Sequence, residues 1–187
     1  MAITRIGGAN AITGTIPTSV GGTGSTATTL PASLINNTSI GNVTALPASI
    51  TTGKVLQVVN NTQTSRFTTS STSFVAATGY TIAITPSATS SKVFVCISAM
   101  SDSGATNRVN YMTIYRDSTN LGEGNDGLAS SHSEGARIYT PVTLSVLDSP
   151  STTSSITYQV YMRAYNGNVV FNDQESKAQL TAFEIAG

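Results

Sequence analysis

The chain has few of the residues from which catalytic and metal sites are usually built. Among its 187 residues there are one cysteine, one histidine and no tryptophan, and only 10% are charged, with a formal net charge of +0. The single cysteine excludes an intrachain disulfide and a multi-cysteine metal site. The lack of net positive charge argues against nucleic acid as a partner, because lysine and arginine supply most phosphate contacts.

Long apolar runs are also missing. No stretch approaches the roughly 20 residues of a membrane-spanning helix, and the first residues lack the charged segment and apolar core of a secretory signal. We therefore expect a protein that is made in a cytoplasm and does not insert into a membrane.

The polar residues form no recognisable catalytic or metal-binding pattern. His132 lies in the segment Ser-Ser-His-Ser-Glu, which we place in a surface loop, and neighbouring residues cannot face one another as a catalytic triad requires. The segment 123–127 lacks the alternating ligands and final glutamate of a calcium-binding loop. We expect no enzyme, cofactor or metal, and interpret Cys96 as a small buried hydrophobic residue. A glycan-cleaving enzyme is the alternative, because a pair of catalytic carboxylates need not be close in sequence.

The composition changes sharply near Gly53. Residues 1–53 contain one charged residue, Arg5, and no aromatic residue, whereas every aromatic residue follows Gly53. Such a segment cannot form a core of its own, yet it is too aliphatic for an ordinary solvated linker. We therefore predict two regions, an extended arm over residues 1–53 and a globular domain over residues 54–187.

A short phrase occurs three times in the arm: an aliphatic residue, proline, a small residue, serine and a second aliphatic residue. Proline fixes its own backbone and pushes the preceding residue into an extended conformation. One extended segment cannot bury its aliphatic side chains, but three copies around an axis can. We predict that these residues anchor the chain and hold it as a homotrimer: Ile16, Pro17, Val20, Leu30, Pro31, Leu34, Leu46, Pro47 and Ile50. The alternative is a flexible tether that the prolines stiffen.

The domain is predicted to be all-β. Its strand-like segments are short, rich in β-branched and aromatic residues, and separated by clusters of serine, threonine and proline. They cover residues 54–59, 80–86, 92–99, 111–116, 138–147, 157–165, 169–171 and 180–186. No window shows a capped helical period. The pattern predicts an antiparallel β-sandwich of the jelly-roll kind.

Two further predictions concern how the strands are arranged. Asn166-Gly167 has the sequence of a type I′ turn, which predicts a hairpin between residues 157–165 and 169–171. Several strands are apolar on both faces, although a sandwich needs only one apolar face per sheet. The second apolar face predicts a surface that another subunit covers.

Several phrases, taken in order along the chain, resemble those of small structural proteins of bacteriophages. In the arm, Gly14-Thr15-Ile16-Pro17 through Gly21-Gly22-Thr23-Gly24 is similar to short repeats of tail-fibre proteins. The similar phrases of the domain are Gly53-Lys54-Val55-Leu56-Gln57-Val58-Val59, Thr85-Pro86-Ser87-Ala88-Thr89-Ser90-Ser91-Lys92-Val93, Leu147-Asp148-Ser149-Pro150 and Phe183-Glu184-Ile185-Ala186. The resemblance implies a virion structural protein, usually homotrimeric, with its arm on the particle and a β-sandwich facing outward.

The resemblance favours a short tail fibre, whose arm binds the tail or baseplate and whose sandwich touches a glycan or protein of the host surface. The candidate contact residues are Asn107, Arg108, Asp126, His132, Tyr165 and Asn166. Three copies of a weak site would gain from multivalency. The alternative is a capsid decoration (cement) protein, whose arm would bind the major capsid protein. In both cases we expect the protein in the virion, after synthesis in the bacterial cytoplasm.

Overall fold

The computed structural model describes residues 54–173 and 176–187, and within these ranges the chain is all-β, with no helix. The strands are β1 (Val55–Gln63), β2 (Phe67–Thr69), β3 (Val75–Ile84), β4 (Lys92–Asp102), β5 (Arg108–Arg116), β6 (Thr119–Asn120), β7 (Ala129–Ser133), β8 (Tyr139–Asp148), β9 (Ile156–Ala164), β10 (Val169–Phe171) and β11 (Ala178–Ile185). The arm residues that we predict to form a trimer, Ile16 to Ile50, lie outside the described residues.

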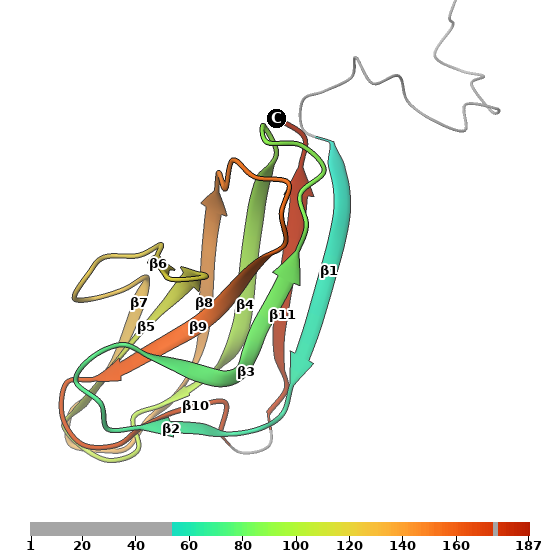
Figure 1. Cartoon of the computed structure of the whole chain (residues 1–187). Coiled ribbons are helices and arrows are strands. Elements are labelled where there is room, and N and C mark those ends of the chain that lie inside the picture. The colour runs from blue at the N-terminus through green and yellow to red at the C-terminus, as the bar shows by residue number, and fades with distance from the viewer. Residues whose placement is uncertain (1–53, 174–175) are drawn as a thin grey trace, which may run out of the picture. The chain divides into compact units, whose positions relative to one another are not determined.

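The strands form two antiparallel sheets that pack face to face (Figure 1). Sheet A has the order β1-β11-β4-β10-β2, with β8 paired to β4, and sheet B has the order β3-β9-β5-β6, with β7 paired to β5. If the eight longest strands are numbered in chain order, sheet A runs 1-8-3-6 and sheet B runs 2-7-4-5. This is the strand order of a jelly roll. The predicted β-sandwich is therefore confirmed.

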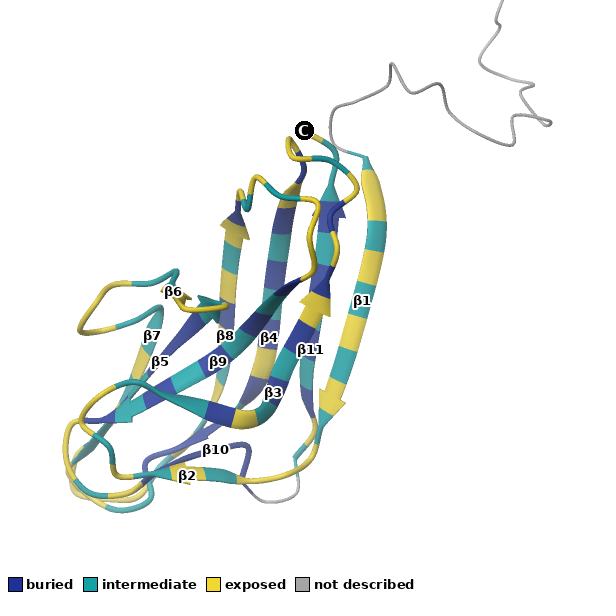
Figure 2. Cartoon of the chain, viewed as in Figure 1, coloured by how far each residue is buried: buried dark blue, intermediate teal, exposed yellow. Residues whose placement is uncertain are grey.

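Buried residues alternate along the strands of both sheets (Figure 2), and their side chains form the core between the sheets. In β9, Tyr158, Val160 and Met162 are fully buried while the residues between them face outward, as the sequence alternation predicts. Toward one end of the sandwich the Tyr80 ring meets the Phe171 ring edge to face, with centroids 4.9 Å apart. Burial of such aliphatic and aromatic side chains is the main source of stability in a domain of this kind.

A buried carboxylate ties three segments together at the end of the sandwich where β1 begins. Glu184 of β11 accepts hydrogen bonds from the Ser87 N–H and hydroxyl, the Ser91 hydroxyl and the Gln57 amide, at 2.6 to 2.7 Å. Burial alone would raise the pKa of Glu184, but the bonds from Ser87, Ser91 and Gln57 outweigh burial and lower that pKa to about 2. The carboxylate therefore fixes β1 and the β3–β4 loop to β11.

A second carboxylate organises the opposite end, where β4 finishes. Asp102 is fully buried and accepts hydrogen bonds from the Arg137 guanidinium and from the Gly104 N–H. Arg137 also donates to Asp173 at 2.9 Å. Burial opposes ionisation of Asp102, but the donors of Arg137 and Gly104 lower its pKa below the usual value. These bonds hold the loops that surround β10.

The predicted hairpin at Asn166-Gly167 is wrong. β9 pairs with β3 and β5 in sheet B, whereas β10 pairs with β2 and β4 in sheet A, so the turn carries the chain between sheets. A type I′ turn needs positive φ at both central residues, and only Gly167 has it, at 58°. At this turn the pairing within the two sheets prevails over the local turn preference.

Two single-residue predictions are also wrong. Cys96 is partly exposed on the outer face of sheet A, because strand alternation directs its neighbours Val95 and Ile97 into the core. His132 is exposed but lies within β7, where it pairs with Val109, and not in a loop. The sequence analysis also did not predict strands at β2, at β7 or in the first half of β3.

Candidate functional site

The outer face of sheet A bears an apolar row that crosses four strands. Val58 of β1 lies opposite Phe183 of β11, Phe183 lies opposite Phe94 of β4, and Phe94 lies opposite Leu147 of β8. We call these four residues the apolar row. The two phenylalanine rings are 6.2 Å apart, and the outermost side chains, Val58 and Leu147, are 53% and 54% exposed.

The apolar row lies at the end of sheet A where the chain enters the domain. Val55, the first residue of β1, is 52% exposed and lies opposite Ile185, which extends the apolar surface toward that end. The next row in the other direction is polar and contains Asn60, Thr181, Cys96 and Ser145. The apolar surface is therefore confined to one end of the sheet.

Both edges of this surface are open among the described residues. β1 pairs only with β11, and β8 pairs only with β4. Pro141, which has no N–H to donate, lies in β8, and proline is tolerated in a sheet only at such an edge. The prediction that some strands are apolar on both faces is confirmed for β4 and β11, and the apolar residues of their second face are half-buried in the single chain.

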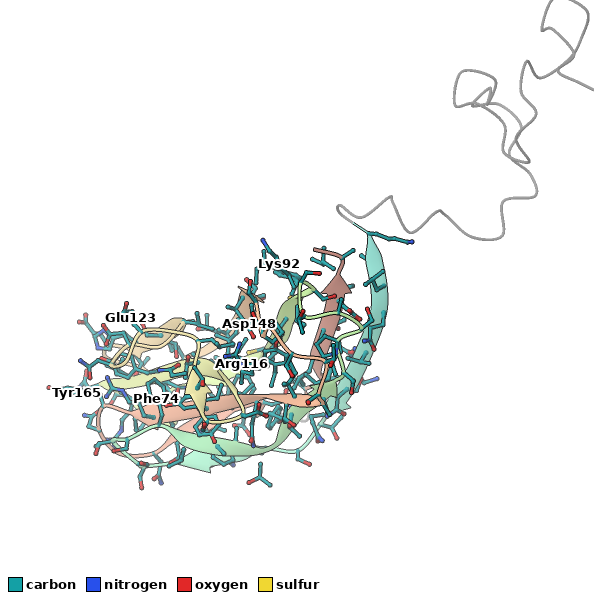
Figure 3. All side chains as sticks on the ribbon, turned by 45° about the horizontal axis from the view of Figure 1, so that its top comes forward. Phe74, Lys92, Arg116, Glu123, Asp148 and Tyr165 are labelled. Atoms are coloured by element: carbon teal, nitrogen blue, oxygen red, sulfur yellow. The ribbon has the colours of Figure 1, made fainter. Side chains whose placement is uncertain are left out.

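The outer face of sheet B has a different character, because rings and loops border an open pocket there. We call it the aromatic pocket; its volume is about 350 Å³. It is lined by Thr72, Ser73, Phe74, Tyr115, Gly124, Asn125 and Arg163. These residues come from the β2–β3 loop, from β5, from the β6–β7 loop and from β9. In Figure 3, Phe74 and Glu123 lie toward the same end of the domain as Tyr165.

The strands set the positions of the pocket's rings. Tyr115 of β5 and Tyr161 of β9 both face outward, and their rings stack with centroids 3.9 Å apart and planes at 22°. Phe74 stands beside them, with its centroid 6.5 Å from that of Tyr115 and the two planes at 60°. Because Tyr161 supports the Tyr115 ring from outside the pocket, the aromatic wall is held in one orientation.

The loop after β6 closes the pocket on one side. Glu123 and Gly127 bond to each other through their backbones, and the Leu128 N–H donates to the Met112 carbonyl. Gly127 has φ of +70°, and a Cβ there would stand 2.4 Å from the Met112 carbonyl oxygen. Only glycine allows this close approach, so Gly127 fixes where the loop crosses β5.

Arg163 joins the loop to the sheet. Its Nε–H donates to the Asn125 carbonyl at 2.6 Å, and its guanidinium carbon lies 4.0 Å from the centre of the Tyr111 ring. Its other side faces Phe74 at 5.7 Å, and Asp126 is 3.7 Å away. Arg163 is therefore held by a carbonyl, two rings and a nearby carboxylate, and it forms one wall of the pocket.

The predicted host-contact residues fall into two groups. Asn107, Arg108, Tyr165 and Asn166 meet at the end of the sandwich away from the apolar row, where the Asn166 amide donates to the Asn107 carbonyl at 3.0 Å and Tyr165 is 66% exposed. His132 follows beside them on β7. In Figure 3, Tyr165 lies at one end of the molecule and Lys92 toward the other.

Asp126 belongs elsewhere, on the loop beside Arg163. The sequence predictions missed the pocket residues Phe74, Tyr115 and Arg163 as a site. The alternation in β9 already placed Arg163 and Tyr161 on the face opposite the core, which was the available signal. The loops that complete the pocket left no comparable pattern.

The described residues contain no group of three or more His, Cys, Asp or Glu side chains that could hold a metal ion. They also contain no helix that is long and apolar enough to cross a membrane. The chemical groups that line the pocket are aromatic rings, hydroxyl groups, an amide and a guanidinium.

Comparison with known proteins gives no family and a distant structural likeness. No family model matches the chain, and no curated protein matches it. Among solved structures it is similar to the D431N mutant VP2 protein of infectious bursal disease virus, in derived T=1 particles, with a TM-score of 0.35 and 11% identity. The match covers 71% of this chain but only 37% of that protein. The resemblance to tail fibres rests on the sequence phrases alone.

Proposed function

We propose that this protein is a non-enzymatic structural component of a bacteriophage virion, a short homotrimeric tail fibre. The observation that supports this proposal most directly is the apolar row on sheet A. A contiguous apolar surface on one chain favours burial against another protein, because leaving it in water forgoes about 25 cal/mol for each Å² that could be covered.

The position of the apolar row supports a second and third copy of the same chain as its partners. The 53 residues before Lys54 contain the recurring proline phrase, and they join the domain at β1, beside Val55 and Val58. If three arms associate around an axis, they bring the starts of three β1 strands together and raise the local concentration of the rows. A modest contact between sandwiches is then sufficient.

The far end of each sandwich would then face the host. Asn107, Tyr165 and Asn166 lie at that end, while the apolar row and the start of β1 lie at the other. A trimer would present three such ends in parallel, so that weak contacts with a glycan or protein of the host surface add up. The role in host contact rests on this arrangement and on the resemblance of the sequence phrases.

The assembly is tested by static light scattering of the full chain at micromolar concentration. We expect three times the mass of the 19.2 kDa chain, and a monomer at this concentration would refute the trimer. Counting copies in purified particles then separates two virion roles. A few dozen copies or fewer support a tail fibre, whereas hundreds support capsid decoration.

A further inference from the structure

We propose that the aromatic pocket on sheet B binds a saccharide unit. This inference deepens the proposed function, because host contact would then pass through a defined site whose lining does not include Tyr165. The volume of about 350 Å³ is at the small end of the usual range for ligand pockets, about 300 to 1,000 Å³. It fits a ligand of one or two rings and not an extended chain.

The aromatic wall matches one side of a sugar. A pyranose ring presents C–H groups on its faces and hydroxyl groups around its edge, so it packs well against a flat, fixed aromatic ring. Tyr115 and Phe74 offer such rings, and the stack of Tyr161 behind Tyr115 at 3.9 Å prevents its rotation. A ring that is already held in place loses little conformational entropy when a ligand binds.

The rim of the pocket matches the edge of a sugar. The side-chain hydroxyls of Thr72, Ser73 and Tyr115 and the Asn125 amide have no hydrogen-bond partner among the described residues. Where Ser73 and Asn125 do bond within the chain, they use backbone atoms. Hydroxyl and amide groups both donate and accept, as the hydroxyl groups of a sugar require. These polar residues line the pocket together with the rings of Tyr115 and Phe74.

The charge of the pocket argues against a phosphorylated ligand. Arg163 is the only cationic residue in the lining, and it is already bonded to the Asn125 carbonyl and lies near Asp126. Polyphosphate sites usually combine several cationic or backbone N–H donors. In this pocket Arg163 instead presents its remaining N–H groups to neutral oxygen atoms of a ligand.

The proposal is tested with full-length protein and a panel of methyl glycosides, namely those of glucose, galactose, mannose, rhamnose, N-acetylglucosamine and N-acetylgalactosamine. Saturation-transfer NMR at millimolar glycoside identifies binders, and a titration then gives the dissociation constant. We expect transfer to at least one glycoside. No transfer to any member of the panel would overturn the proposal.

Gly124 is the position at which a larger side chain can block the pocket. It lines the pocket, its φ is not in the left-handed region, and a Cβ there would meet nothing within 4 Å, so larger side chains fit without strain. We expect Gly124→Trp to fill the mouth of the pocket and weaken binding at least tenfold, whereas Glu134→Trp, at an exposed position outside the lining, leaves the affinity unchanged. Unaltered binding by Gly124→Trp would overturn the proposal.

Tyr165→Ala tests the location of the site. Tyr165 is exposed at the loop end and does not line the pocket, so this variant should bind the glycoside as the unmodified protein does. Loss of binding in Tyr165→Ala, with Gly124→Trp unaffected, would place the saccharide at the loop end and reject the pocket. Glycoside binding by a monomeric chain would reject the trimer and keep the pocket, so the two proposals fail separately.

Discussion

The outer faces of the two sheets belong to one sandwich but differ in chemistry and shape. On sheet A, the apolar row consists only of strand residues in register, from Val58 to Leu147, and no loop covers it among the described residues. On sheet B, the loops before β3 and after β6 lie beside stacked rings and border an open pocket. A flat apolar face suits another protein surface, whereas a small polar and aromatic pocket suits a small ligand. The contrast supports the proposals that assembly uses sheet A and that ligand binding uses sheet B.

The largest expected effect comes from placing a charge in the apolar row. Leu147→Glu should raise the dissociation constant of the trimer about a thousandfold, because burying an unpaired carboxylate costs several kcal/mol and each 1.4 kcal/mol is a factor of ten. Since Leu147 is 54% exposed in the single chain, the sandwich itself should still fold. Analytical ultracentrifugation over a dilution series measures the shift.

The matched control is Thr143→Glu, which places the same charge on the same face of β8 but in a polar row. It should leave the trimer intact, and so should Gly124→Trp on sheet B. If both glutamate variants weaken assembly equally, the apolar row is not the contact and the division between the two sheets is wrong.

The next largest effect is on the pH dependence of stability, through the Glu184 carboxylate beneath the apolar row. The pKa of Glu184 is lowered from 4.5 to about 2, so its contribution to stability is complete above pH 4.5 and is lost as the pH falls toward 2. The shift corresponds to about 3 kcal/mol at neutral pH. Glu184→Gln should destabilise the domain, because the new amide group would face the Gln57 amide donor. It should also flatten the dependence of unfolding on acid pH, because Gln carries no titratable carboxyl group.

Urea unfolding at several pH values between 2 and 7 measures this effect. Glu134→Gln, which changes an exposed carboxylate on the loop after β7, is the control and should leave the curve of stability against pH in place. An acid dependence that persists in Glu184→Gln would show that other carboxylates, such as Asp102, dominate it.

A smaller effect is expected on sheet B. Tyr161→Leu keeps an apolar side chain but removes the stack on Tyr115, which should cost about 0.5 to 1.5 kcal/mol of stability. The Tyr115 ring would then be free to rotate, so affinity for a bound glycoside should fall while the trimer persists. Urea unfolding measures the stability of this variant, and light scattering on the same sample measures its assembly state. A trimer that dissociates in this variant would contradict the separate roles proposed for the two faces.

Much of the fold could be predicted from the sequence because strand alternation is a local signal. In β9 the buried series Tyr158, Val160 and Met162 was visible in the residues themselves. The failures occur where non-local pairing decides. The turn at Asn166-Gly167 has the sequence of a hairpin, but its flanking strands find partners in different sheets. The run around Cys96 is apolar at every position, so the sequence could not show that Phe94 and Cys96 face outward.

The two candidate surfaces were predictable to different degrees for the same reason. The second apolar face of the strand around Phe94 was visible in sequence, and it predicted a covered surface without giving its register. The aromatic pocket depends on four segments far apart in the chain, and its residues Ser73, Tyr115, Asn125 and Arg163 show no shared pattern. Short-range periodicity can predict a sheet face, but it cannot predict which loops will meet above it.

The smallest expected effect is a change in the reaction rate of the Cys96 thiol, which reports on assembly. Cys96 lies on β4 in the polar row next to Phe94 and is partly exposed in the single chain. If trimer formation covers the apolar row, access to the neighbouring thiol should fall, and thiol reactions depend on access. We expect the unmodified trimer and Thr143→Glu to react with a disulfide reagent several-fold more slowly than Leu147→Glu does at the same concentration. Equal rates in all three proteins would indicate that the outer face of sheet A stays open to solvent, and that any trimer is held by contacts elsewhere in the chain.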